Sequence, residues 1–386
     1  MDERSEEMHV LHEDMHFDTV KRVRRRRRNS LWARKTRRLR HWIKEHKALS
    51  VLIGIVLFLL LILLLWLLWL WMHLNEVERF DLDLDDRPPY YGGQNILLVG
   101  LDCDAEAPVS DSLRHCNPDE GTDLSDLEHA SATGNRSDVI MVLHVSEDGS
   151  KAQLVSIPRD SYVEVKGHGR TKINAAFSYG GPSLLAHTVE QATGLYINHM
   201  AVVDFHGFKG ISNAIGGVQV YVKDEITVPG TGQVAWPQGW QTIKGEDALT
   251  YVRTRYGLPR GDFDRVQRHQ NFLRAVMQRT QSMAVLANPL AVTRLVGEVT
   301  GNLAVDSGFK NSEILDLTFA GLQLRMDDIS YATVPYEGSA MVDGASVVLL
   351  KEKEMRELFD AIAHDRFISY VNDHPVETLP ADQDVD

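Results

Sequence analysis

Basic residues are outnumbered over most of this chain, and cysteine is nearly absent. The whole sequence has 41 Lys and Arg against 54 Asp and Glu, a net charge of −13. Residues 1–47 alone carry +7, which leaves −20 for residues 48–386. Such an acidic chain argues against nucleic acid as the ligand. The only cysteines are Cys103 and Cys116, and two cysteines without paired histidines nearby do not form a convincing zinc site.

Charge is missing altogether from Ala48 to Met72, a run dominated by Leu, Ile, Val and Trp. A bilayer core of ~30 Å needs about 20 apolar residues in a helix, and this run is longer. A cleaved signal peptide and a buried core helix are the alternatives. The run is too long for the apolar part of a signal peptide, and no Ala-x-Ala site follows it. We therefore expect residues 48–72 to form a retained transmembrane helix.

The charges on either side of this helix differ in sign. Fourteen Lys and Arg lie between Lys21 and Lys47, whereas residues 75–86 are mainly acidic. Because basic flanks stay on the cytoplasmic side, residues 1–47 are predicted to be a cytoplasmic arm and the chain after about residue 75 to lie outside. The arm could instead be a nucleic-acid or nuclear-targeting patch, but topology and contact with anionic lipid explain it better beside a membrane helix. The outer compartment permits disulfides, and Cys103 and Cys116 are expected to be bridged.

The outer part has the pattern of one α/β domain, in which a central, mostly β-sheet layer is flanked by helices. Strands are predicted at 96–99, 139–145, 153–157, 201–205 and 218–222, and helices at 183–193, 208–214 and 265–283. The predicted boundaries are a linker at 75–93, a domain at 94–365 with a polar insertion at 104–135, and an acidic tail at 366–386. The linker reads as a semi-rigid spacer, and the tail is expected to be loose from about Asn372.

The most informative stretch is Tyr251–Arg268, which holds five arginines in 16 residues: Arg253, Arg255, Arg260, Arg265 and Arg268. The first two are expected to share one side of an extended segment, and the last two one face at the start of a helix capped by Asp264. Arginine forks suit phosphate oxygens, and a helix N-terminus favours anions, so a diphosphate would offset the repulsion among the arginines. The alternative is a solvated helix face on which Asp262 and Asp264 pair with them.

Two further groups lie near predicted strand ends. Asp102 follows one strand and Asp138 opens the next, so their carboxylates are expected to meet and share a hard cation such as Mg²⁺. Strand-end caps are the alternative explanation for both. Arg159 follows a strand that Pro158 stops, and Lys172 adds a cation shortly after. Ligands of open α/β sheets bind at such strand ends.

Taken in order, these segments resemble a known family. After the membrane helix come NILLVGLD, RSDVIMVLHV, SIPRDSYV, TKINAAFSYGG, VDFHGFKGISNAIGGVQV and LTYVRTRYGLPRGDFDRVQRHQ. Together they resemble the LytR-CpsA-Psr family of cell-wall phosphotransferases, from about Asn95 to Gln278 and more weakly to about Asp365. The resemblance implies an α/β domain with a hydrophobic groove for a polyprenyl chain. It also implies transfer of a glycopolymer from a polyprenyl-diphosphate carrier to peptidoglycan, as a phosphodiester, at the cell membrane of a Gram-positive-type bacterium.

The resemblance also assigns roles to residues. Asp102 and Asp138 would hold Mg²⁺ or Mn²⁺. The diphosphate would be bound by Arg136, Arg159, Lys172, Arg253, Arg255, Arg260, Arg265, Arg268 and Gln270. Asp138, Asp262, Arg260 and Arg268 would act in catalysis, and the general base stays open between Asp138 and Asp262.

This chain departs from the family pattern at His269, where the family often has glutamine, and in its long insertion at 104–135. Two other functions remain as rivals. The same site could hydrolyse a prenyl diphosphate with water as the acceptor. Alternatively, the protein could be a non-catalytic membrane regulator or scaffold, a role that the basic cytoplasmic arm would suit.

Overall fold

The computed structural model describes residues 46–102, 116–117, 121–122, 136–228, 230–254 and 258–385, with the backbone alone at 102, 116–117, 121–122, 136 and 205. The chain divides into two compact units, Met1–Trp69 and Leu70–Asp386. Helix α2 (Lys47–His73) begins within a residue of the predicted membrane segment. In the described part of the chain, Lys47–Glu76 is the one helical stretch long and apolar enough to cross a membrane, with a mean hydropathy of 3.4. The pairing of Cys103 with Cys116 and most of the insertion lie outside the described residues.

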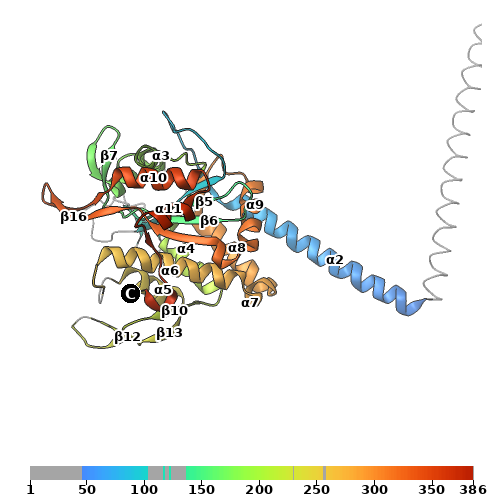
Figure 1. Cartoon of the computed structure of the whole chain (residues 1–386). Coiled ribbons are helices and arrows are strands. Elements are labelled where there is room, and N and C mark those ends of the chain that lie inside the picture. Colours follow the sequence, from blue (N-terminus) through green and yellow to red (C-terminus); the bar gives the residue numbers. More distant parts are fainter. Residues whose placement is uncertain are drawn as a thin grey trace, which may run out of the picture. The chain divides into compact units, whose positions relative to one another are not determined.

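The second unit is built on an eight-stranded mixed sheet with the strand order β1-β14-β9-β2-β5-β6-β15-β18. Two of its central strands, β5 and β6, are labelled in Figure 1. The strands are β1 (Glu78–Phe80), β2 (Gln94–Asp102), β5 (Arg136–Val145), β6 (Ala152–Ser156), β9 (His199–Asp204), β14 (Leu303–Asp306), β15 (Ile329–Thr333) and β18 (Glu377–Thr378). The pairs β1–β14, β2–β9 and β6–β15 are parallel, and the other neighbours are antiparallel. The mixed sheet with flanking helices confirms the predicted fold class.

Helices cover both faces of this sheet (Figure 1). One face carries α3 (Ile173–Thr193), α10 (Glu352–Ala363) and α11 (Phe367–Asp373). The other carries α4 (Phe205–Ala214), α5 (Gly245–Arg253), α6 (Asp262–Gln281), α7 (Met283–Leu286), α8 (Pro289–Asn302) and α9 (Asn311–Gln323). Smaller hairpins are β7 (Tyr162–Val165) with β8 (Gly169–Lys172), β10 (Val218–Val222) with β13 (Gly239–Ile243), β11 (Ile226–Thr227) with β12 (Val234–Trp236), and β16 (Tyr336–Val342) with β17 (Ala345–Leu350). The short strands β3 (Cys116–Asn117) and β4 (Gly121–Thr122) pair with each other, and three 3-10 helices, η1 (Leu74–Glu76), η5 (Met326–Asp328) and η6 (Asp382–Asp384), complete the described elements.

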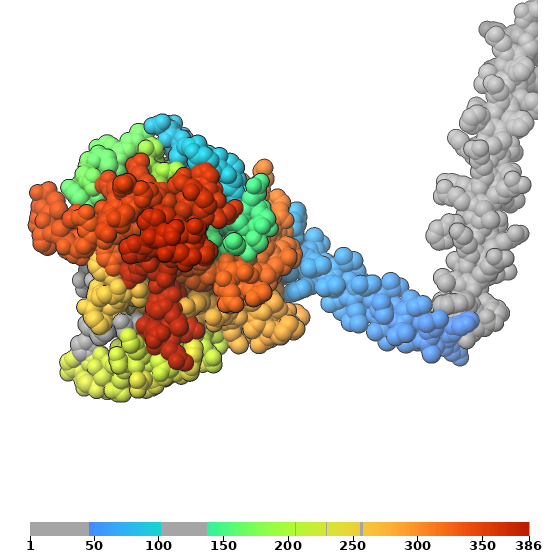
Figure 2. Space-filling model, viewed as in Figure 1, coloured from blue at the N-terminus to red at the C-terminus, as the bar shows by residue number. Residues whose placement is uncertain are grey.

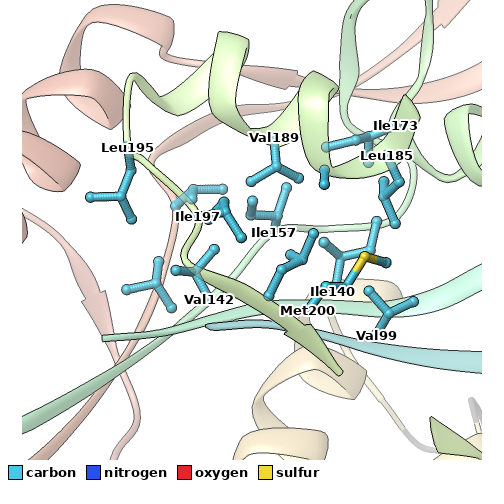
Figure 3. Close-up of a cluster of buried hydrophobic side chains, with 14 of the residues drawn as sticks. Val99, Ile140, Val142, Ile157, Ile173, Leu185, Val189, Leu195, Ile197 and Met200 are labelled. Carbon is cyan, nitrogen blue, oxygen red and sulfur yellow. The ribbon is translucent and has the colours of Figure 1, made fainter. Parts of the chain in front are cut away.

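The main core lies between the sheet and α3 (Figure 3). Val99 of β2, Ile140 of β5 and Met200 of β9 meet Leu185 and Val189 of the helix, and all five are almost completely buried. Each such side chain contributes ~1.5–3 kcal/mol of transfer free energy. Because successive residues of a strand point to opposite faces, Leu98 faces the other side, beneath α6. The sheet is therefore apolar on both faces, as the continuous apolar runs predict.

Two helix predictions need correction. Helix α3 starts ten residues before the predicted position 183 and is kinked at Gly180 and Gly181, ahead of Pro182. Its predicted end is confirmed, because Gly194 adopts the left-handed conformation with φ 74°. The predicted N-cap of α6 is wrong. Gly261, with φ 62°, occupies that position, and Asp264 lies in the first turn.

The predicted linker and tail both belong to the folded unit. Within the linker, β1 pairs with β14 at the sheet edge, and Arg87 forms an ion pair with the buried Glu190 at 2.6 Å. Within the tail, β18 pairs with β15, and Asp382 forms an ion pair with Arg274 of α6. Figure 2 shows this last segment, in dark red, lying across the surface of the unit. The expectations of a spacer and of a loose tail are therefore wrong, because long-range pairing orders both segments.

Candidate functional site

Asp138 occupies a β-bulge at one end of the sheet. Gly100 pairs with Val139 and Leu101 with Ser137, so Asp138 is the extra residue of β5. Bulges re-aim side chains and are common beside active sites. The Asp138 carboxylate accepts a hydrogen bond from Arg159 Nη1 at 2.5 Å. The backbone of Asp102 ends the neighbouring strand at the same end of the sheet, as predicted, but its side chain is outside the described residues.

Arg159 is the centre of a cluster of carboxylates. Its chain position, directly after β6 and Pro158, brings it beside Asp138, as the sequence predicts. Asp160 Oδ2 lies 4.0 Å from Arg159 Nε, and Asp160 Oδ1 lies 2.9 Å from Lys172 Nζ. Burial by itself would lower the pKa of Arg159, but the carboxylates of Asp138, Asp262 and Asp160 together raise it. Arg159 therefore stays charged.

The first turns of α6 bring two more arginines to the same place. Arg265 forms an ion pair with Asp262 and is 6% exposed. Arg268 is 2% exposed, and its Nη1 donates to the carbonyl oxygens of Tyr251 at 3.4 Å and Thr254 at 3.3 Å. Its guanidinium carbon lies 4.7 Å from the centre of the Tyr251 ring, a cation–π geometry. The alternative is right that Asp262 and Asp264 pair with arginines of this stretch. It is wrong that the helix face is solvated, because Arg265 and Arg268 are buried.

His269 connects this cluster to the interior. Its Nε2 donates to the carbonyl oxygen of Val252 at 2.9 Å. Burial, followed by the nearby Arg265, lowers the pKa of His269 to about 4, against opposing effects of the Val252 carbonyl and Asp138. His269 is therefore neutral at pH 7. These interactions place His269 within electrostatic reach of Arg265, Arg268 and Asp138.

An apolar cavity of about 160 Å³ lies on the other side of His269. It lies between β2, β5 and β9 and the helices α4, α5 and α6. Its walls include Leu98, Val139, Ala201, Phe208 and Leu273. Because His269 lines the cavity and Val139 adjoins Asp138, the charged cluster and the cavity share a boundary.

Three other predicted site residues lie in or directly beside α5 and α6. Arg260 Nε donates to Asp264 Oδ1 at 2.6 Å, and its Nη1 donates to Glu377 Oε1 at 2.6 Å. Burial would lower the pKa of Arg260, but the hydrogen bonds to Glu377 and Asp264 raise it. Gln270 is buried, and its Nε2 donates to Ser156 Oγ at 2.8 Å. Arg253 is exposed at the C-terminal end of α5, so its predicted place in an extended segment is wrong.

Besides Asp102, two predicted positions have no described side chain. Arg255 lies outside the described residues, and for Arg136 only the backbone is described, at the start of β5. The residues that the structure brings together are therefore Asp138, Arg159, Lys172, Asp262, Arg265 and Arg268.

The structure adds two acidic residues that the sequence analysis did not assign. Asp160 holds Lys172, and its position directly after Arg159 was the available signal. Glu377 accepts hydrogen bonds from Arg260, from Gln267 Nε2 at 2.7 Å and from the Tyr336 hydroxyl at 2.7 Å. No local pattern predicts Glu377, because its partners lie at least 41 residues away in sequence.

In the part of the chain that is described, no three His, Cys, Asp or Glu side chains are arranged as a metal site. Magnesium commonly takes one or two carboxylates and completes its shell with phosphate oxygens and water. The carboxylate of Asp138 is a suitable ligand of this kind, and the backbone of Asp102 lies on the adjacent strand. The donor chemistry therefore fits a magnesium ion that is shared with a phosphate ligand.

Comparison with known proteins identifies the family. The chain belongs to the LytR_cpsA_psr family, whose model matches residues 75–364. It is 30% identical over 299 residues to the cell wall biosynthesis protein LcpA of Corynebacterium glutamicum, covering 69% of this chain and 55% of LcpA. It is 35% identical over 274 residues to the probable cell wall biosynthesis protein LcpB of the same organism, covering 70% and 61%. The chain thus spans less than two thirds of the length of these relatives.

Solved structures support the fold. The LytR-Csp2A-Psr enzyme from Actinomyces oris superposes with a TM-score of 0.57 at 20% identity, covering 74% of this chain and 96% of that one. TagT bound to LIIa-WTA gives a TM-score of 0.56 at 21% identity, covering 74% and 99%. At these identities the likeness establishes the fold alone. The predicted family and fold class are both confirmed.

Proposed function

We propose that this protein is a membrane-anchored phosphotransferase that moves a glycopolymer from a polyprenyl-diphosphate carrier to peptidoglycan. A relative in Enterococcus faecalis, 30% identical over 224 residues, is named a polyisoprenyl-teichoic acid–peptidoglycan teichoic acid transferase. The apolar helix Lys47–Glu76 supports anchoring. A tethered domain meets a lipid substrate at high effective concentration.

One observation carries the proposal: a buried to partly buried cluster of cations borders an apolar cavity at His269. Arg159 follows β6, and Arg265 and Arg268 lie on α6, so two separate segments of the chain converge around Asp138 and Asp262. A diphosphate would lie against these guanidinium groups, and the first part of the prenyl chain would enter the cavity lined by Leu98 and Leu273. The charged cluster meets the apolar cavity as the diphosphate headgroup meets the prenyl chain in the proposed substrate.

The chemistry needs little beyond position and charge. An acceptor hydroxyl of a wall sugar attacks the phosphorus nearer the glycan, and a new O–P bond forms as the bond to the bridging oxygen breaks. Polyprenyl phosphate leaves. The arginines neutralise charge on the transferring group, which is most of what phosphoryl transfer requires. Asp138 or Asp262 takes the proton of the acceptor hydroxyl. Asp102 and Asp138 would hold Mg²⁺, which would supply further positive charge at the phosphate oxygens.

The test uses the full chain in vesicles with a lipid-diphosphate disaccharide and isolated peptidoglycan. Release of polyprenyl phosphate and glycan phosphate joined to peptidoglycan are both measured. Arg159→Ala should lower turnover by about 10²–10³-fold, the typical cost of removing one donor that stabilises transition-state charge. Arg325→Ala is the control, because Arg325 is an exposed arginine in the turn before β15.

Two results would contradict the proposal. Near-normal turnover by a folded Arg159→Ala protein would show that the diphosphate is not bound at the cluster around Arg159. Equal release of polyprenyl phosphate with and without peptidoglycan, with no glycan joined to the wall, would assign the hydrolase function instead. Loss of activity upon removal of Mg²⁺ with a chelator, restored by Mg²⁺ or Mn²⁺, would support the metal.

A further inference from the structure

Large apolar side chains are exposed along α7, α8 and α9. Met283 is 74% exposed, Leu290 67% and Phe319 58%, and Leu286 and Leu322 are also exposed. We call these five residues the α7–α9 face. Residues 280–293, which supply three of them, contain no charged residue, although residues 48–386 carry a net charge of −20. Clustered exposed apolar side chains mark interaction surfaces.

Hydrogen bonds join the two parts of this face. Gln281, just before α7, donates through Nε2 to the carbonyl oxygens of Gly321 at 2.7 Å and Leu324 at 3.0 Å, at the end of α9. Met283 is two residues from Gln281, and Leu322 directly follows Gly321. The start of α7 and the C-terminal end of α9, which both carry exposed apolar side chains, therefore lie side by side.

The same surface begins close to the place where the apolar helix ends. Asn311 Nδ2, at the first residue of α9, donates to Asn75 Oδ1 at 2.7 Å. Arg79 of β1 contacts the segment just before α9, because its Nη1 donates to the carbonyl oxygen of Phe309 at 2.6 Å. Asn75 is only two residues beyond His73, the last residue of α2. At 1.5 Å per residue, Phe319 lies about 12 Å along α9 from Asn311.

We propose that the α7–α9 face lies against the outer surface of the bilayer, with Met283, Leu290 and Phe319 in contact with lipid. The proposal rests on the membrane anchoring proposed above. If α2 spans the bilayer, Asn75 lies only two residues beyond the end of the spanning helix. Its hydrogen bond with Asn311 then holds the N-terminal end of α9 close to the membrane surface. Apolar side chains on the uncharged segment 280–293 favour the headgroup–acyl boundary. The acidic residues of α9, Glu313 and Asp316, would stay in the aqueous headgroup layer.

The experiment labels the full wild-type chain in vesicles of phosphatidylethanolamine and phosphatidylglycerol. A trace of phospholipid carries a photoreactive diazirine near the headgroup, and adducts are mapped by mass spectrometry. The peptides that contain Met283, Leu290 and Phe319 should carry at least about tenfold more adducts than the β16–β17 hairpin. Met341, in that hairpin, is 69% exposed and is the matched control. The double variant Met283→Gln, Leu290→Gln should lose most adducts from its own peptide.

The outcomes separate this inference from the proposed anchoring. Adducts on α2 with none on the α7–α9 face, or equal adducts at Met341, would overturn the lipid contact and leave the anchoring intact. An unlabelled α2 would overturn both. Cross-links between two copies of the α7–α9 face, without lipid adducts there, would make the face a dimer interface instead.

Discussion

Filling the apolar cavity should weaken lipid binding without unfolding the protein. Ala201 of β9 lines this cavity, opposite the face that Met200 presents to the main core. Ala201→Leu adds three carbon atoms and removes space for about three methylenes of a prenyl chain. At ~0.8 kcal/mol per buried methylene, the loss is about 2.4 kcal/mol, or roughly 50-fold in affinity. The added side chain enters existing space, so the melting temperature should be unchanged or higher.

The assay is binding of a fluorescent polyprenyl phosphate to the full chain in mixed micelles, together with the KM for the lipid-diphosphate substrate. Ala345→Leu, at an exposed position that begins β17, is the control and should change neither value. An Ala201→Leu protein that melts normally and still binds lipid within threefold of wild type would show that the prenyl chain does not use this cavity. The reasoning from cavity to substrate would then be refuted.

Three other changes test the charges. Burial holds the pKa of His269 in the folded protein at about 4, whereas the pKa in the unfolded chain is near 6.5. The stability that rests on neutral His269 is therefore fully present above pH 6.5 and is lost as the pH falls from 6.5 through 4. His269→Gln should remove up to about 3 kcal/mol of that acid-side loss, measured by urea unfolding at pH 7 and pH 4.5. Glu377→Gln should speed amide exchange in the loop that carries Arg260 and leave the melting temperature nearly unchanged, since this pair is partly exposed. Arg87→Ala leaves the buried Glu190 without its cation. The free energy of unfolding, measured with urea, should fall by about 3–5 kcal/mol. A fall below about 1 kcal/mol would show that the Arg87 segment does not stabilise the folded unit.

The long central strands follow from local sequence, whereas the short edge strands do not. Apolar runs predict β2, β5, β6 and β9 within a few residues, because burial on both faces leaves a nearly uninterrupted apolar pattern. The pairings of β1 with β14 and of β15 with β18 depend on partners tens to hundreds of residues away. Two or three polar residues give no periodic signal, so the linker and tail read as irregular.

The candidate site shows the same division. Arg159, Lys172 and Arg265 are recognisable from motif and spacing, and the fold brings them to one end of the sheet. The role of Asp264 was not predictable from spacing. Its position fits a cap, but Gly261, with a φ of 62°, is the residue that precedes the helix. The Asp264 carboxylate instead accepts a hydrogen bond from the backbone N–H of Arg260 at 2.7 Å. This bond ties the loop before α6 to the first turn of the helix.

The division between cavity and cluster limits where a diphosphate can lie. The ring N–H of His269 is already donated to Val252, and the carboxylate of Asp204, the other acidic or basic wall residue, accepts from the backbone N–H of Gly207 at 2.8 Å. A phosphate inside the cavity would lose its hydration and find no donor in the apolar wall, a cost of several kcal/mol. Under the proposed function, the headgroup would stay at the boundary, where Arg159 and Arg265 lie beside the partly exposed Asp262. Under the proposed function, the cavity sets the depth of the lipid, and the arginines thereby set the position of the phosphorus that is attacked.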